Sequence, residues 1–181
     1  MNIRPYKQHQ PKIDSTAFID DSAVIIGQVS IGKHSSVWPL TAIRGDIQSI
    51  TIGDETNIQD GSVLHVTHAS EYALNPEGNP LSIGNKVTIG HKVILHGCTI
   101  HDNCLIGMGS IILDGAEIQD NVMVGAGSLV PSNKVLDSGY LWLGSPVKRA
   151  RKLTDKELAF LQYSAAHYRK LGEKHGEQPH L

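Results

Sequence analysis

A six-residue repeat of aliphatic side chains is the feature that most constrains how this chain can fold. The repeat starts at Ile19, shifts by three residues after Ile43, breaks between Leu64 and Ile83, and slips by one residue after Leu95. A period of six matches neither the 3.6-residue period of a helix nor simple strand alternation. It fits short strands joined by tight turns, with one inward aliphatic residue per repeat and glycine where the backbone bends.

Three such strands make one coil of a prism, and the pattern resembles the hexapeptide-repeat family. That resemblance implies an all-β fold, a left-handed parallel β-helix shaped as a triangular prism. We expect the prism to span residues 1–150, with an inserted loop at 66–82, and residues 141–152 to form a turn-rich exit.

Residues 151–181 are expected to add a C-terminal α-helix that packs on the prism as part of the same domain. Thr154 and Glu157 have the spacing of a capping box at its start. Its apolar face is expected to be Leu158, Leu161, Ala165 and Tyr168.

Composition gives no indication of a nucleic acid or membrane partner. The formal net charge is −2 and the pI is about 6.5, so no basic footprint is present. The first residues lack the apolar segment of a signal peptide, and we expect a cytoplasmic protein. Cys98 and Cys104 lack CxxC spacing and are interpreted as free, buried thiols.

Two histidines occupy equivalent places on successive coils. Ile43, Leu64 and Leu95 fall on one face when the faces are assigned in order, and His65 and His96 each follow such a residue. Their backbones should lie about 4.8 Å apart, and two imidazoles so stacked can reach one metal ion. An ordinary polar ladder is the alternative interpretation.

His91 does not belong to that column, because it lies two places after Ile89 on the neighbouring face. In a threefold ring of identical prisms, His91 of one chain could approach the His65 and His96 pair of the next. Three histidines and an open fourth position are the layout of a catalytic zinc site. The alternative is an unrelated surface histidine.

Three segments, "VWPLTAIRGD", "NIQDGSVLH" and "IGHKVILHG", resemble the γ-class carbonic anhydrase family. The resemblance covers nearly the whole chain. It implies a homotrimer with metal sites between subunits, the ligands His65, His91 and His96, and reversible hydration of carbon dioxide to bicarbonate. Zinc is the expected metal, although iron(II) and cobalt(II) also accept histidine nitrogen.

Other residues carry over from the family one at a time. Gln59 and Asn57 match amides that orient bound water and substrate, although turn formation also explains them. Arg44 and Asp46 match a pair at the site and subunit interface, and a structural ion pair is the alternative. Asp60 is expected to support that network. Tyr163 matches a tyrosine near the site, where packing is the alternative.

The chain departs from the family's most active branch where protons are transferred. Ile47 stands where that branch has glutamate, and the inserted loop has only Glu71 and Glu77. His68, three residues after His65, is a candidate proton carrier because an unperturbed histidine titrates near pH 6.5. A solvated loop residue and a competing metal ligand are the alternatives. Carbonic anhydrase activity is therefore expected to be slow or absent.

Two alternatives to a carbonic anhydrase stay open. One is an acyltransferase or thioesterase acting on coenzyme A thioesters, since many transferases share the repeat and the segment "GSPVK" resembles part of them. The other is a metal-binding or assembly protein without turnover, because fold alone does not establish activity.

Overall fold

The aliphatic repeat builds the inner wall of a left-handed parallel β-helix in the computed structural model, which describes residues 2–177. Strands of successive coils pair in parallel, so that Leu64 lies beside Leu95, and Leu95 beside Ile112. These inward side chains are completely buried. The fold class expected from the repeat is confirmed.

The prism has three faces, which we name by what distinguishes them. The histidine face consists of the first half of β6 (Ala42–Ile52) with β8 (Val63–His65), β11 (Ile94–His96), β14 (Ile111–Ile112) and β17 (Leu129–Val130). The second face consists of the last part of β6 with β9 (Leu81–Ile83), β12 (Thr99–Ile100), β15 (Glu117–Ile118) and β18 (Val135–Leu136).

The third face, the helix face, consists of β3 (Phe18–Ile19), β5 (Ser36–Val37), β7 (Asn57–Ile58), β10 (Thr88–Ile89), β13 (Leu105–Ile106), β16 (Met123–Val124), β19 (Tyr140–Gly144) and β20 (Val147–Lys152). At the N-terminal end, β1 (Asn2–Arg4) and β2 (Lys12–Ile13) both pair with β4 (Val24–Ile31).

Small hydroxyl residues fill the corners of the prism and satisfy backbone groups there. Ser62 Oγ donates to the carbonyl of Gly90 at 3.1 Å, and Thr56 Oγ1 donates to the carbonyl of Gly84 at 2.8 Å. Both side chains are buried. A buried carbonyl without such a partner would be destabilising, so these short side chains allow tight corners.

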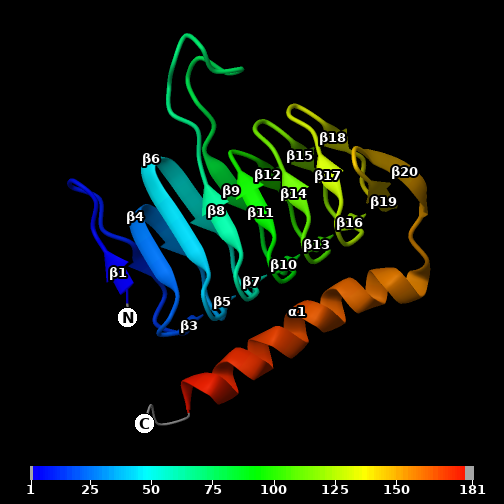
Figure 1. Ribbon diagram of the computed structural model, residues 1–181. Helices are drawn as coiled ribbons and strands as arrows, with labels where there is room; N and C mark the ends of the chain where they lie inside the picture. Colours follow the sequence, from blue (N-terminus) through cyan, green and yellow to red (C-terminus); the bar gives the residue numbers. More distant parts are fainter. Residues whose placement is uncertain (1, 178–181) are drawn as a thin grey trace.

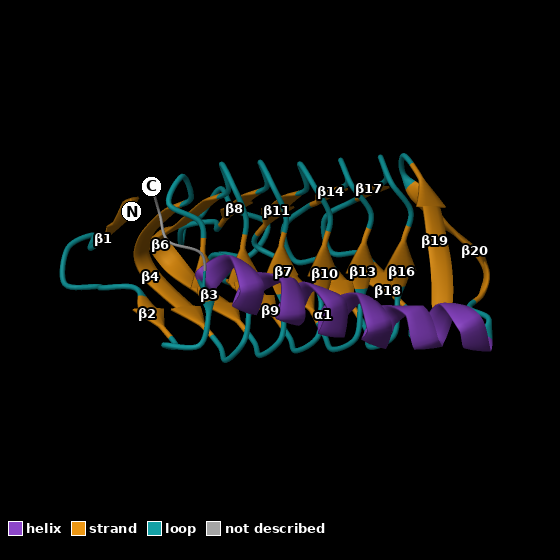
Figure 2. Ribbon diagram, turned by 90° about the horizontal axis from the view of Figure 1, so that it is seen from below, coloured by secondary structure: helices purple, strands orange, loops and turns teal. Residues whose placement is uncertain are grey.

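The C-terminal helix α1 (Asp155–Gly176) lies along the helix face (Figure 2). The expected capping box is confirmed, because Thr154 Oγ1 accepts from the amide of Glu157 while the Glu157 carboxylate accepts from the amide of Thr154. Leu161 and Ala165 of the expected apolar face are buried, together with Ser164 and Gly172. Nothing in residues 2–177 forms a helix with the length and apolar character needed to span a membrane.

The prediction of a turn-rich exit at residues 141–152 was wrong. Strands β19 and β20 form an antiparallel pair that closes the C-terminal end of the helix face. The last coil has no following coil to pair with, and the returning chain satisfies its exposed backbone groups. The last four residues of the expected helix segment, 178–181, lie outside the described residues.

The inserted loop between β8 and β9 extends away from the prism (Figure 1). Its base is closed by an antiparallel bridge between Thr67 and Asn79, and Gln48 Nε2 donates to the carbonyl of Glu77 at 2.9 Å. Tyr72 and Leu74, farther along the loop, are strongly exposed. The loop is thus held at its base, directly after the strand that ends in His65.

Candidate metal centre

His65 and His96 lie side by side on the histidine face. They are register partners in the pairing of β8 with β11, and both side chains point outward because Leu64 and Leu95 point inward. His65 Nδ1 lies 3.1 Å from His96 Nε2. The stacked column expected from the repeat is therefore present, whereas the role of the two histidines as metal ligands stays a prediction.

The other ring nitrogen of each histidine is held by its own carboxylate. His65 Nε2 lies 3.1 Å from Asp46 Oδ1, and His96 Nδ1 lies 2.9 Å from Asp114 Oδ1. An ionised carboxylate only accepts hydrogen bonds, so a proton on each of these ring nitrogens would satisfy both contacts. In those tautomers the two nitrogens that face each other would both present lone pairs, and a shared cation would relieve their repulsion.

The donor set and its spacing fit a zinc ion. Two nitrogen ligands of a tetrahedral zinc, each bound at 2.0–2.1 Å, lie about 3.3–3.4 Å apart, close to the 3.1 Å between the facing nitrogens. Metal-binding histidines commonly donate their second N–H to a carboxylate, which fixes the tautomer. Asp46 and Asp114 are placed to do this for His65 and His96.

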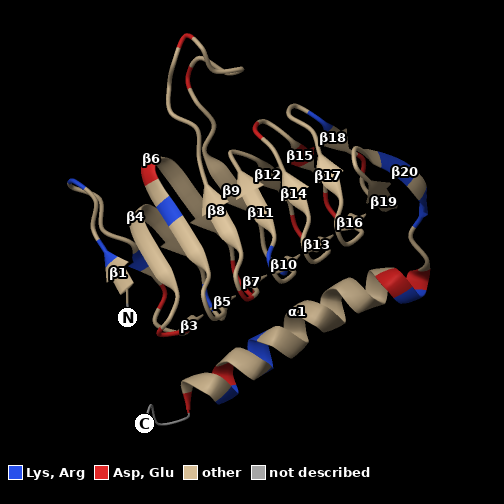
Figure 3. Ribbon diagram, viewed as in Figure 1, with Lys and Arg blue, Asp and Glu red and all other residues tan. Residues whose placement is uncertain are grey.

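Local electrostatics favour neutral His65 and ionised Asp46. Burial, the largest influence, lowers the pKa of His65, although the hydrogen bond to Asp46 acts the other way. Burial alone would raise the pKa of Asp46, but hydrogen bonds from Arg44 and His65 together lower it below its usual range. Arg44 Nη1 donates to Asp46 Oδ2 at 2.6 Å, and Figure 3 shows the basic and acidic segments of β6. A neutral imidazole is the form that binds metal.

Asp114 and Thr67 were missed in the sequence. Asp114 lies one coil beyond His96, two places after the inward Ile112, and Thr67 Oγ1 donates a hydrogen bond to its carboxylate. Gly97 makes room for this contact, because a Cβ there would collide with Asp114 Oδ1. Its φ of +53° also favours glycine at this position. The histidine column itself continues to Leu113, whereas Asp114 lines up with Gly97, so extending the column by one coil would not have found it.

His91 lies at a different corner, directly after the helix face. Its Nδ1 lies 2.9 Å from Asp60 Oδ2, and both side chains are about half exposed. Asp60 thus binds His91 in the way that Asp46 and Asp114 bind the pair. Within residues 2–177 of one chain, no three potential ligands converge on a common point that would hold a metal ion. A complete three-histidine site therefore requires a second copy.

Asn57 and Gln59 belong to a buried polar chain that leads to α1. Gln59 Nε2 donates to Asn57 Oδ1 at 3.0 Å, and Asn57 Nδ2 donates to Thr88 Oγ1 at 3.1 Å. Thr88 Oγ1 lies 2.9 Å from Ser164 Oγ on the helix. Gln59 precedes Asp60, so the chain ends beside the His91 corner rather than at the His65 and His96 pair.

Tyr163, the remaining expected site residue, is exposed, and so are the two positions considered for proton transfer, Ile47 and His68. Tyr163 is 62% exposed, and its ring stacks on His167 with centroids 5.8 Å apart. Ile47 is partly exposed on β6, and His68 is exposed at the base of the inserted loop. Within one chain Tyr163 does not reach the paired histidines, because Tyr163 lies on α1, which covers the helix face and not the histidine face.

An outward aliphatic column runs beside the paired histidines. Val63 and Ile94 are 43% and 41% exposed, and each is two residues before a histidine of the pair. The column continues through Ile111 and Leu129, which are register partners on the next two coils. An exposed apolar column of this kind is suited to contact with another protein surface.

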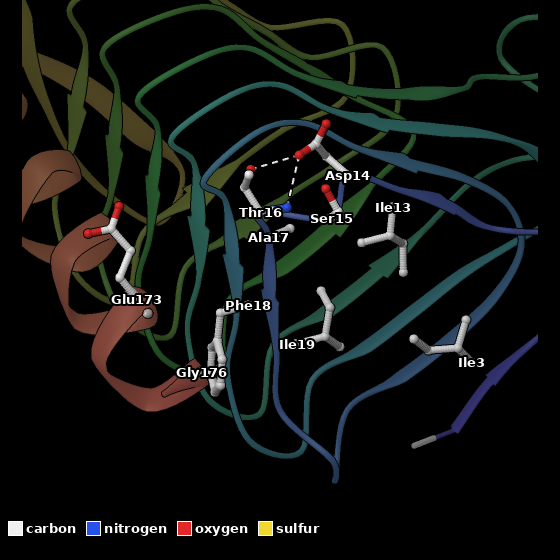
Figure 4. A pocket seen from close by; sticks show the side chains of 11 residues that line it. Ile3, Ile13, Asp14, Ser15, Thr16, Ala17, Phe18, Ile19, Glu173 and Gly176 are labelled. Atoms are coloured by element: carbon white, nitrogen blue, oxygen red, sulfur yellow. Dashed lines mark hydrogen bonds between the residues drawn. The ribbon is translucent and has the colours of Figure 1, made fainter. Parts of the chain in front are cut away.

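A separate cavity of about 450 Å³ lies at the N-terminal end, between the first coil and the end of α1 (Figure 4). Ile3, Ile13 and Ile19 line one side of it, and Glu173 lies on the other. Its lining contains none of the expected site residues. Cys98 and Cys104 are free, buried thiols, as expected, and burial raises the pKa of Cys98 far above its usual range and that of Cys104 to about 12.

Family models match two stretches of the chain. Residues 97–132 match the bacterial transferase hexapeptide (six repeats), and residues 80–113 match the hexapeptide repeat of succinyl-transferase. Among solved structures, one of a Bacillus cereus protein described as a candidate acetyltransferase is similar, with 43% identity and a TM-score of 0.88. It covers 96% of this chain and 95% of that one.

Three curated relatives align over almost the whole chain. The protein YrdA of Escherichia coli is 57% identical, covering 97% of this chain and 95% of the relative. A carbonic anhydrase of Geobacillus kaustophilus is 44% identical, covering 94% and 89% respectively. The mitochondrial gamma carbonic anhydrase 1 of Arabidopsis thaliana is also 44% identical, covering 93% of this chain and 60% of the relative.

Proposed function

This chain belongs to the hexapeptide-repeat family that includes the γ-class carbonic anhydrases, and from that premise we propose that it is a metal-dependent enzyme that interconverts carbon dioxide and bicarbonate. The observation that carries the proposal is the His65 and His96 pair. Its facing nitrogens are 3.1 Å apart, and each outer nitrogen is held by a separate carboxylate. A structural polar ladder has no need for that arrangement.

The proposed ligands are His65 and His96 of one chain and His91 of the next. Asp60 holds Nδ1 of His91, which leaves its Nε2 directed away from its own chain's carboxylate. Zinc is the proposed ion, and iron(II) or cobalt(II) would accept the same nitrogens. When bound, such an ion supplies Lewis-acid activation of water near neutral pH.

The chain's own groups hold that centre and orient what binds there. Asp46, supported by Arg44, keeps the proton on His65 Nε2. Asn57 accepts from the amide nitrogen of Gln59, so the amide oxygen of Gln59 is the atom left to orient a bound water or substrate. His68 is the proposed proton carrier, since Ile47 has no proton to transfer, and slow turnover is expected.

The proposed assembly is a homotrimer. Two features support it: the ligand set is incomplete in one chain, and the aliphatic column through Val63 and Ile94 lies exposed beside it. Rotational packing of identical chains brings different faces together and can place His91 against the neighbouring pair. Covering the column would also remove water from the rim of the site.

Stopped-flow measurement of carbon dioxide hydration by the zinc-loaded protein tests the proposal. We expect activity in the natural protein and none in His91→Ala or His65→Ala alone. Mixing the two inactive variants, with subunit exchange, should restore part of the activity, because some interfaces then combine an intact pair with an intact His91. Absence of hydration by the folded, zinc-loaded natural protein would contradict the proposal.

A second candidate is acyl transfer from a coenzyme A thioester. The description of the Bacillus cereus structure and the transferase names of the matching family models favour it. Thioester cleavage that persists in His65→Ala, with no zinc requirement, would support this candidate. Zinc binding without either reaction would leave a metal-binding protein without turnover.

A further inference from the structure

We propose that Asp114 is a positioning residue for His96: it keeps the proton on Nδ1, so that the lone pair of Nε2 faces His65. The proposal deepens the metal site and rests on the proposed function for its consequence. Its basis is the 2.9 Å contact between Asp114 Oδ1 and His96 Nδ1. A neutral imidazole carries one proton, and placing it on Nδ1 leaves Nε2 as the only nitrogen able to bind a metal ion.

A further hydrogen bond and the absence of a side chain at Gly97 hold Asp114 in place for this task. Thr67 Oγ1 donates to Asp114 Oδ1, the same oxygen that accepts from His96. Thr67 Oγ1 also lies 3.3 Å from His96 Nδ1, so the three side chains form a closed cluster. Gly97 provides the space that the carboxylate occupies. The cluster lies on two neighbouring coils and the base of the inserted loop, and it is half-buried.

The position of Thr67 gives the cluster a second property. Thr67 forms the first bridge of the inserted loop, with Asn79, and its hydroxyl touches the residue that sets the His96 tautomer. The loop base and the metal ligand are therefore fixed by the same carboxylate. Displacing the loop base would withdraw one of the hydrogen bonds that orient Asp114.

Asp114→Asn is the direct test, because it keeps the shape of the side chain but gives it an N–H donor. An amide that donates to Nδ1 favours the opposite tautomer, with the proton on Nε2. The matched control is Glu117→Gln, because Glu117 Oε1 holds His101 Nε2 at 3.1 Å on the second face, where no other imidazole of the described part of the chain converges. Thr67→Val, which removes only the hydroxyl, is the milder variant.

The first measurement is the tautomer of His96 in the metal-free protein, read from the two imidazole nitrogen shifts after labelling histidine with ¹⁵N. The natural protein should show the Nδ1–H form, and His96→Gln assigns the signal. Asp114→Asn should shift the population toward Nε2–H, whereas Glu117→Gln should leave it unchanged. The Nε2–H form in the natural protein would overturn the proposal without reference to any variant.

The second measurement is zinc affinity, by competition with a chromophoric chelator. Loss of an outer partner of a metal-bound histidine typically weakens affinity by about 10- to 100-fold, and we expect that loss in Asp114→Asn, a smaller one in Thr67→Val, and none in Glu117→Gln. Unchanged affinity in Asp114→Asn would overturn the proposal. If the natural protein bound no zinc, the proposed function would fail. The tautomer measurement, which uses metal-free protein, would still test the role of Asp114.

Discussion

The histidine face and the second face each carry a histidine directly after an inward residue, but the two sites differ in what surrounds that histidine. His96 follows Leu95 and meets a second imidazole and a carboxylate. His101 follows Ile100, and within residues 2–177 its ring nitrogen has the carboxylate of Glu117 as its partner, with both side chains 44% exposed. A histidine paired with a carboxylate is thus common to both faces, and convergence of two imidazoles is what sets the candidate centre apart.

The columns of outward side chains beside these histidines also differ between the two faces. On the histidine face the column is aliphatic, from Val63 through Ile94 to Ile111. On the second face the corresponding column is polar, from Ser82 through Thr99 to Glu117. One face is therefore suited to contact with another protein surface and the other to water, although the coils beneath them are alike.

Removing a proposed ligand should have the largest effect. We expect His96→Ala to abolish measurable zinc binding, because loss of a direct ligand exceeds the about 10- to 100-fold loss from an outer partner. His101→Ala should bind zinc like the natural protein. Equilibrium dialysis with metal analysis measures both, and equal affinities in the two variants would erase the distinction between the faces.

Charging the aliphatic column should disrupt assembly. Ile94→Lys places a charge where the proposed trimer buries an apolar side chain, so sedimentation should show a shift from trimer toward monomer. Thr99→Lys, at the equivalent position of the second face, should leave the mass unchanged. A trimer that survives Ile94→Lys while Thr99→Lys dissociates would place the interface on the other face.

Truncating an inward residue should destabilise the protein to a similar extent on either face. Leu95 and Ile100 are both buried in the core, and truncating either to alanine should reduce the free energy of unfolding by about 2–5 kcal/mol. Denaturant unfolding at several protein concentrations separates this loss from any effect on assembly. A much smaller loss at one of the two would indicate that the core is unevenly packed.

The smallest effect is expected at the start of α1, away from both compared faces. A hydrogen bond from Arg151, followed by those from Thr154, lowers the pKa of Glu157 to about 2 from an ordinary value of 4.5. A lowered pKa in the folded state stabilises the protein above pH 4.5, and that contribution disappears as the pH falls toward 2.

Glu157→Gln should therefore be slightly less stable than the natural protein at neutral pH and equal to it near pH 2. Thermal unfolding across this range measures the difference, with Glu117→Gln as the control. A stability difference that grows on acidification would contradict the assigned contacts.

The sequence predicted the prism and the histidine column because both depend on counting residues. Each coil contains three repeats, so Leu64 and Leu95 fall on the same face of successive coils. His65 and His96, which follow them, are therefore also neighbours. Counting residues along the repeat did not predict contacts that depend on the shape of individual side chains. Asp114 reaches His96 only because Gly97 has no Cβ, and no spacing rule reveals that space.

Counting also failed at the C-terminal end of the prism, where β20 turns back on β19 because no further coil follows. The relation of His91 to the pair is a different matter. It depends on a second copy, so the contacts of one chain leave it a prediction.

Inward and outward side chains alternate along each strand, so one set of residues determines the packing of the core and the other determines the chemistry of the surface. In Ile94, Leu95 and His96 the middle residue serves the core, while the flanking residues face outward. A lineage can exchange outward residues over evolutionary time with little effect on folding. The same inward residues can therefore support different outward surfaces, in keeping with an architecture shared by a relative described as a candidate acetyltransferase and one named carbonic anhydrase.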